Sequence, residues 1–143
     1  MKRTFKEMEQ KSPKRLKVKN ELDWSIITDM IMKKKYFELG RGAYGKVYLI
    51  NYKNTNLAIK VSENDLCTEE FYDLLNEGLR ILYPRSPFIV NYLGTHIDYT
   101  QWKVYIAMDY CAGHTLLNYM NSNCNIIEDK LKLILYSLLK GVE

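Results

Sequence analysis

The chain has 143 residues, of which 47% are apolar and 27% are charged, and its formal net charge is +4. This length is sufficient for one ordinary domain, and the composition is typical of a soluble globular protein. No uninterrupted apolar run approaches the ~18 residues of a membrane span, so we expect no membrane contact. Much of the mild positive charge lies at the N-terminus, so the net charge is only weak evidence for a nucleic-acid partner and we do not expect one.

The first 20 residues are polar and basic, and we expect them to be disordered because they offer little apolar surface to bury. Basic clusters at residues 2–3 and 14–19 have the form of a bipartite nuclear import signal, with a solvated basic arm as the alternative. Cys67, Cys111 and Cys124 form no disulfide framework, so we expect reduced thiols and an intracellular protein. We expect it in the nucleus if the basic signal acts, and otherwise in the cytoplasm.

The hydrophobic pattern then predicts a mixed fold. Residues 22–35 have apolar side chains at roughly helical spacing and are expected to form a short helix or strand that packs onto the domain. A helix is predicted over residues 68–83, and two more over 116–120 and from about 128 onward. Five strands are predicted, at residues 36–39, 46–51, 57–61, 88–93 and 104–109. This order excludes an alternating βαβ sheet.

Three glycines, Gly40, Gly42 and Gly45, form a G-x-G-x-x-G pattern that fits three kinds of nucleotide site. In Rossmann and Walker A sites the last glycine opens a helix, whereas the residues after Gly45 have strand composition. A Walker A motif also needs a serine or threonine hydroxyl that binds magnesium after its lysine, and Val47 occupies that position here. A Rossmann site needs an acidic residue about twenty residues past the first glycine to bind the ribose, and Lys60 occupies that position here. The glycine-rich loop of a protein kinase, a hairpin, is the remaining alternative.

The strand residues Ala58-Ile59-Lys60 fit the kinase V-A-I-K signature, and from residue 36 onward the chain resembles a eukaryotic-type protein kinase. The resemblance covers the N-terminal ATP-binding lobe, the hinge and the first helices of the second lobe. It implies an α+β fold, in which a five-stranded antiparallel sheet with one αC-like helix precedes one or two helices of an incomplete second lobe. We expect residues 1–33 to be a tail and lead-in, and residues 34–143 a truncated kinase domain divided at residue 110.

The resemblance also implies an ATP site. Lys60 and Glu77 would form the ion pair that holds the α- and β-phosphates. Val47 and Ala58 would cover the adenine, Met108 would be the gatekeeper, and the backbones of Asp109 and Cys111 would hydrogen-bond the adenine edge. The glycine-rich loop would close over the phosphates through Leu39, Gly40, Arg41, Gly42, Ala43, Tyr44, Gly45 and Lys46.

Two motifs of the family, H-R-D-x-x-x-x-N and D-F-G, do not occur in this sequence. They supply the catalytic aspartate and the ligands of the Mg²⁺ that the family uses, so we expect neither of these here and no other metal site. Because these motifs are missing, we expect the chain as given to be inactive alone. We expect a serine/threonine kinase rather than a tyrosine kinase because the serine/threonine kinases are the larger group. The alternative is a non-catalytic kinase-lobe mimic that pairs with a true kinase. Partners would be ATP, a protein substrate or another kinase, and whatever covers the apolar stripe of the last helix.

Overall fold

The computed structural model describes residues 22–63, 68–79, 86–122 and 128–142. The predicted basic tail and its import signal lie outside the described residues. The chain divides into two compact units, one formed by residues 1–84 and 91–110 and the other by residues 85–90 and 111–143. Each unit is described by itself below.

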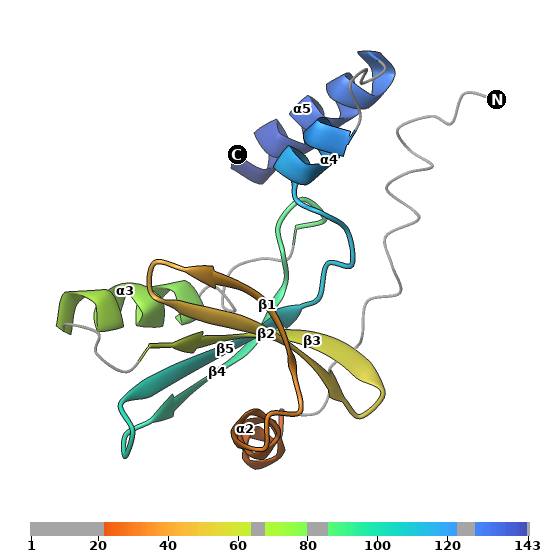
Figure 1. The fold of residues 1–143 in the computed structure, drawn as a ribbon. Helices are drawn as coiled ribbons and strands as arrows, with labels where there is room; N and C mark the ends of the chain where they lie inside the picture. The colour runs from red at the N-terminus through yellow and green to blue at the C-terminus, as the bar shows by residue number, and fades with distance from the viewer. Residues whose placement is uncertain (1–21, 64–67, 80–85, 123–127, 143) are drawn as a thin grey trace. The chain divides into compact units, whose positions relative to one another are not determined.

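The first unit is built on a five-stranded antiparallel sheet with strand order β1-β2-β3-β5-β4 (Figure 1). Its strands are β1 (Phe37–Gly42), β2 (Gly45–Tyr52), β3 (Thr55–Ser62), β4 (Tyr92–Asp98) and β5 (Lys103–Asp109). Lys53 and Asn54 have φ angles of 47° and 63°, which is the backbone of a two-residue type I′ turn between β2 and β3. The sheet confirms the predicted fold class.

Strand β5 contributes to two cores, because successive side chains of a strand point to opposite faces of the sheet. Tyr105 and Ala107 belong to one buried cluster, together with Ile59 of β3. Val104 and Ile106 belong to the other. Each face of the sheet therefore packs against its own helix.

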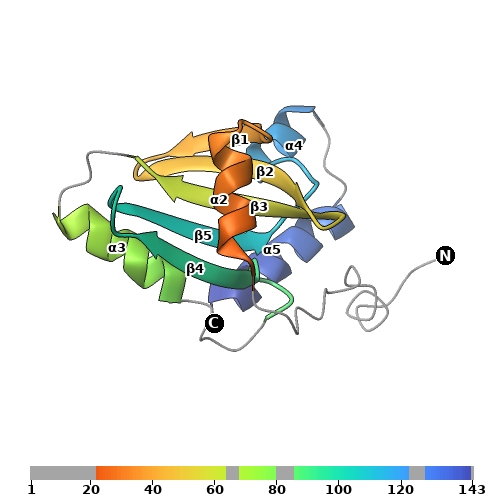
Figure 2. The same ribbon diagram turned by 90° about the horizontal axis from the view of Figure 1, so that it is seen from below.

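Helix α2 (Trp24–Met32) covers the first of these faces (Figure 2). The Asp23 carboxylate caps its N-terminus by accepting a hydrogen bond from the Ser25 backbone N–H, with N and Oδ1 3.1 Å apart. Ile27 is fully buried in the cluster, and the Trp24 ring stacks on His96 of β4 with centroids 5.5 Å apart. Residues 22–35, which the sequence predicts to form either a short helix or a strand, therefore contain a helix.

Helix α3 (Thr68–Gly78) lies on the opposite face. Its Leu74 is fully buried against Val104 and Ile106 of β5. Glu69 and Glu70 lie in the first turn, where the helix dipole favours negative charge. The predicted continuation to residue 83 runs into residues 80–85, which lie outside the described residues.

One strand boundary was predicted wrongly. The strand expected over residues 88–93 begins only at Tyr92, because Ser86 organises a turn before it. The Ser86 hydroxyl oxygen accepts a hydrogen bond from the Phe88 N–H at 3.2 Å, and its carbonyl accepts one from the Ile89 N–H at 3.4 Å. The apolar Phe88 side chain serves the second unit instead, where its ring packs edge-on against Tyr136 at 5.8 Å.

The second unit contains helices α4 (Leu116–Ser122) and α5 (Glu128–Val142). The sequence predicts an apolar stripe on this helix that consists of Ile127, Leu131, Ile134, Leu138 and Val142. No described residue of α5 is fully buried: Ile134 is half-buried, and Leu131, Leu138 and Val142 are 44%, 53% and 87% exposed. Ile127, the first residue of that stripe, lies outside the described residues. Among the helices that the structure describes, none is both long and apolar enough to cross a membrane.

Candidate functional site

The glycine pattern lies in a β-hairpin formed by β1 and β2, with Ala43 and Tyr44 at its turn. Since a strand follows Gly45, the hairpin has the backbone of a kinase loop rather than of a Rossmann or Walker site. A Cβ added at Gly45 would overlap the backbone of β3, where it would lie 2.9 Å from the Val61 carbonyl carbon. Gly45 is thus required by strand packing. A Cβ at Gly40 would meet nothing within 4 Å, so that stretch of backbone is open to a ligand.

Lys60 and Glu77 form an ion pair that connects the sheet to helix α3. Lys60 Nζ lies 2.6 Å from Glu77 Oε2, and the two side chains are 17% and 24% exposed. The second carboxylate oxygen, Oε1, lies 3.4 Å from the Tyr92 hydroxyl of β4, which donates to it. A short, partly buried pair of this kind fixes one cation in place without removing it from solvent entirely.

Four of the predicted site residues share one face of the sheet. Val47 lies directly opposite Lys60 in the β2–β3 ladder, and Ala58 lies opposite Met108 in the β3–β5 ladder. Directly opposed residues point to the same face, as do residues two apart such as Ala58 and Lys60. The register therefore places small and apolar side chains beside the Lys60 ammonium group, which suits a ligand with a flat apolar ring and an anionic end.

Other predicted loop residues have additional contacts. Arg41 Nη2 pairs with Glu63 Oε1 at 2.5 Å, and Lys46 Nζ lies 3.6 Å from Glu38 Oε2. The Arg41 guanidinium hydrogen-bonds the Glu63 carboxylate and holds the pKa of that carboxyl below its ordinary value. Leu39 and Ala43 are exposed. The half-buried Tyr44 ring packs against the α3-side cluster of Leu74, Val104 and Ile106.

The end of β5 leads to the expected hinge. The Asp109 backbone N–H donates to the Asn91 carbonyl oxygen at 3.0 Å, so this donor is already used within the first unit. Cys111 begins the second segment of the second unit and is an exposed free cysteine.

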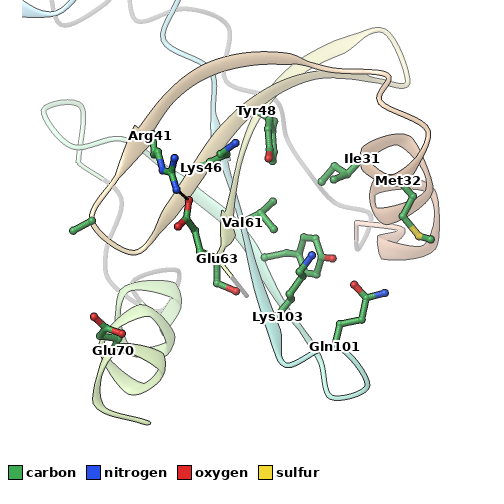
Figure 3. A pocket seen from close by; sticks show the side chains of 13 residues that line it. Ile31, Met32, Arg41, Lys46, Tyr48, Val61, Glu63, Glu70, Gln101 and Lys103 are labelled. Atoms are coloured by element: carbon green, nitrogen blue, oxygen red, sulfur yellow. Dashed lines mark ion pairs between the residues drawn. The ribbon is translucent and has the colours of Figure 1, made fainter. Parts of the chain in front are cut away.

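A hollow of about 660 Å³ is lined by residues of α2, α3, β1, β2, β3 and β5, and neither Lys60 nor Glu77 is among them (Figure 3). Val61, Tyr48 and Tyr105 line it together with Lys46 and Lys103. Burial raises the pKa of both tyrosine hydroxyls above the ordinary value of 10.0. Nothing in the sequence pattern indicated this hollow, because its lining comes from six separate elements.

The ligands of the family's Mg²⁺ come from the H-R-D and D-F-G motifs, which this sequence lacks. Within the residues that the structure describes, no group of three or more histidine, cysteine, aspartate or glutamate side chains could hold a metal ion.

The five-stranded sheet, the glycine-rich hairpin and the lysine–glutamate pair together have the architecture of the N-terminal lobe of a protein kinase. The family model described as protein kinase domain matches residues 33–143, which is more than half of the chain. The chain belongs to the protein kinase family.

Two proteins of Dictyostelium discoideum are similar to it. Serine/threonine-protein kinase 4 homolog B is 34% identical over 106 residues, which cover 73% of this chain and 9% of that protein. A second protein, described as a probable serine/threonine-protein kinase, is 29% identical over 105 residues, which cover 73% of this chain and 5% of that protein. The chain therefore spans less than a tenth of the length of either relative.

Proposed function

We propose that the chain is the ATP-binding part of a serine/threonine protein kinase, and that ATP binds on the sheet face that carries Lys60. The observation that carries this proposal is the 2.6 Å pair between Lys60 and Glu77, on the same face as Val47, Ala58 and Met108. Lys60 would hold the α- and β-phosphates, with the open backbone at Gly40 and Gly42 above them. The adenine ring would lie against Val47 and Ala58.

A titration of the 143-residue chain with ATP tests this proposal. Lys60→Met keeps most of the apolar stem and removes the cation, and a charge-assisted contact of about 1.5–3 kcal/mol predicts a Kd raised roughly 10- to 150-fold. Lys53→Met, in the β2–β3 turn, is the matched control and should leave the Kd unchanged. Equal titration curves for Lys60→Met and the unaltered chain, both folded by circular dichroism, would reject the site.

The second candidate function is a non-catalytic module that pairs with a true kinase. It is favoured by the exposed apolar side chains of α5, which include Leu135 and Leu139 at 50% and 71% exposure. A soluble protein rarely exposes several large apolar side chains together unless they pack against more protein. Intact mass measurement of the natural product decides between the candidates: a longer chain containing the H-R-D and D-F-G motifs supports the enzyme, and a product that ends at Glu143 supports the module.

A further inference from the structure

Helix α3 and the edge strand β4 meet at Gly78 and Thr95. Gly78 is buried, and a Cβ added there would lie 2.6 Å from Thr95 Oγ1 and 2.8 Å from Thr95 Cγ2. The Thr95 hydroxyl also donates a hydrogen bond to the Gly78 carbonyl oxygen, with a distance of 3.0 Å between the oxygens. Rotation about χ1 of Thr95 would break this hydrogen bond and still leave a heavy atom against the added carbon. The approach of the helix to the strand therefore requires glycine at this position.

The residue before this contact is Glu77, and β4 holds it as well. Tyr92 donates to Glu77 Oε1 at 3.4 Å while Lys60 binds Oε2 at 2.6 Å. Neighbouring residues of α3 are thus held by two residues of one strand. The Glu77 carboxylate cannot keep its place unless the helix keeps its distance from β4.

An irregularity in β4 makes this double contact geometrically available. Tyr92 and Thr95 are three residues apart and would point to opposite faces of a regular strand. The ladder shifts register between Tyr92 and Gly94, so that Tyr92 lies opposite Met108 and Thr95 lies opposite Ile106. Ile106 belongs to the α3-side cluster and Met108 packs against it, so the bulge turns Tyr92 and Thr95 toward the same helix.

We propose that Gly78, Thr95 and Tyr92 are positioning residues that set the distance of α3 from β4 and thereby bring Glu77 to Lys60. This inference rests on the proposed ATP site, because its functional consequence is the placement of the Lys60 ammonium group. Alanine at position 78 forces the helix away from Thr95 by several tenths of an ångström, and the short Glu77–Lys60 contact is lost. An account based on helix propensity alone predicts the opposite, since alanine is the better helix former.

The test uses the 143-residue chain and two measurements. The first is the nuclear Overhauser effect between the Lys60 ε-methylene and the Glu77 γ-methylene protons without nucleotide, and the second is the Kd for ATP. For Gly78→Ala we expect loss of the Overhauser effect and roughly tenfold weaker ATP binding. Asn76→Ala, at an exposed position of α3, is the control for helix propensity and should change neither measurement.

A second substitution provides the rescue. Thr95→Ala removes both atoms within 3 Å of the added carbon, so the double variant Gly78→Ala/Thr95→Ala should recover the Overhauser effect and bring the Kd to within about threefold of its original value. An unchanged Overhauser effect in Gly78→Ala overturns the inference. If the unaltered chain shows the effect but does not bind ATP, and the effect is lost and recovered as expected, the proposed function fails while the positioning role stands.

Tyr92→Phe keeps the inference testable if Gly78→Ala does not fold, because it removes a single hydroxyl and preserves the ring. We expect the Glu77 side-chain carboxyl carbon signal to shift and ATP binding to weaken by about threefold. A Glu77 signal identical to that of the unaltered chain would contradict the role of Tyr92 and, with it, the proposed arrangement.

Discussion

The buried Ser62 hydroxyl oxygen accepts a hydrogen bond from the Val104 backbone N–H, with N and Oγ 3.0 Å apart. The β3–β5 ladder has its last regular pair at Val61 and Tyr105, so this side chain extends the connection between the strands by one residue. Ser62→Ala should leave the Val104 donor buried without an acceptor and lower the free energy of unfolding by about 1–3 kcal/mol. Urea denaturation followed by circular dichroism measures the change.

Ser122→Ala serves as the comparison for this experiment, because its hydroxyl donates to the Asn118 carbonyl at an exposed position of α4. Water can replace that contact, so the free energy of unfolding should change by less than about 0.5 kcal/mol. Equal effects of the two substitutions would show that the Ser62 contact adds nothing beyond an ordinary surface hydroxyl.

The glycines of the hairpin should respond differently to alanine. Gly45→Ala should lower the free energy of unfolding by about 1–3 kcal/mol, because the added carbon overlaps the β3 backbone at Val61. Gly40→Ala has room and should be neutral or slightly stabilising. Under the proposed function it should nevertheless weaken ATP binding. Thermal unfolding and ATP titration of both variants separate the structural glycine from the ligand-facing one, and equal destabilisation would refute the distinction.

Arg41 should control the titration of Glu63. The hydrogen bond from Arg41 is the main cause that lowers the Glu63 pKa, so Arg41→Gln should raise that pKa toward its ordinary value of 4.5. Because the folded-state pKa is depressed, the stabilising contribution is present above the unfolded pKa and is lost as pH falls through the folded pKa. Carbon-detected NMR titration of the carboxyl groups measures the shift.

Asp98 supplies an internal reference in the same titration. Its pKa is also lowered, but mainly by the Thr100 hydroxyl and the Thr100 backbone N–H in the β4–β5 turn. Arg41→Gln should leave the Asp98 pKa unchanged while the Glu63 pKa rises. A parallel movement of both groups would indicate a general change of charge or fold rather than loss of one contact.

Helix α2 should contribute strongly to the stability of the first unit. Ile27→Ala removes a fully buried side chain from the cluster on the α2 side of the sheet, and we expect a loss of about 2–5 kcal/mol in the free energy of unfolding. Ile26→Ala makes the same chemical change on the next residue, which is 39% exposed, and should cost less than about 1 kcal/mol. Similar midpoints in urea for the two variants would mean that α2 is not docked in solution.

The sequence was sufficient to predict the strand-rich first unit because its strands have strong local signals. Alternating apolar and polar side chains and β-branched residues indicate β2 and β3. The resemblance to protein kinases, which includes Ala58-Ile59-Lys60, indicates Glu77 as the partner of Lys60. The distance between these two side chains came only from the structure. Helix α2 could not be distinguished from a strand because its 14-residue segment is apolar enough for either, and only its packing on Ile50 and Ile59 decides.

The contacts around β4 could not be predicted for a physical reason. The run Phe88–Ile89–Val90 has strand composition, but Pro87 and the Ser86 turn prevent pairing until Tyr92. The register shift between Tyr92 and Gly94 then reverses the expected facing of Thr95. A glycine inside a helix is expected only to weaken it, so its role as a close contact at Gly78 becomes visible only when the opposing strand is in place.

The alternation of β3 and β5 between two cores has a practical consequence for anyone who labels this protein. In β3 no residue from Leu57 to Ser62 is exposed, so a spectroscopic probe attached there would disturb one helix or the other. Every residue of β1 is exposed, although the strand pairs with β2 on both sides of a register shift between Glu38 and Gly40. Glu38 and Arg41 take part in ion pairs, and Leu39, Gly40 and Gly42 belong to the predicted ATP site. Phe37, which is 68% exposed, is therefore the position of β1 where a reporter can follow the hairpin.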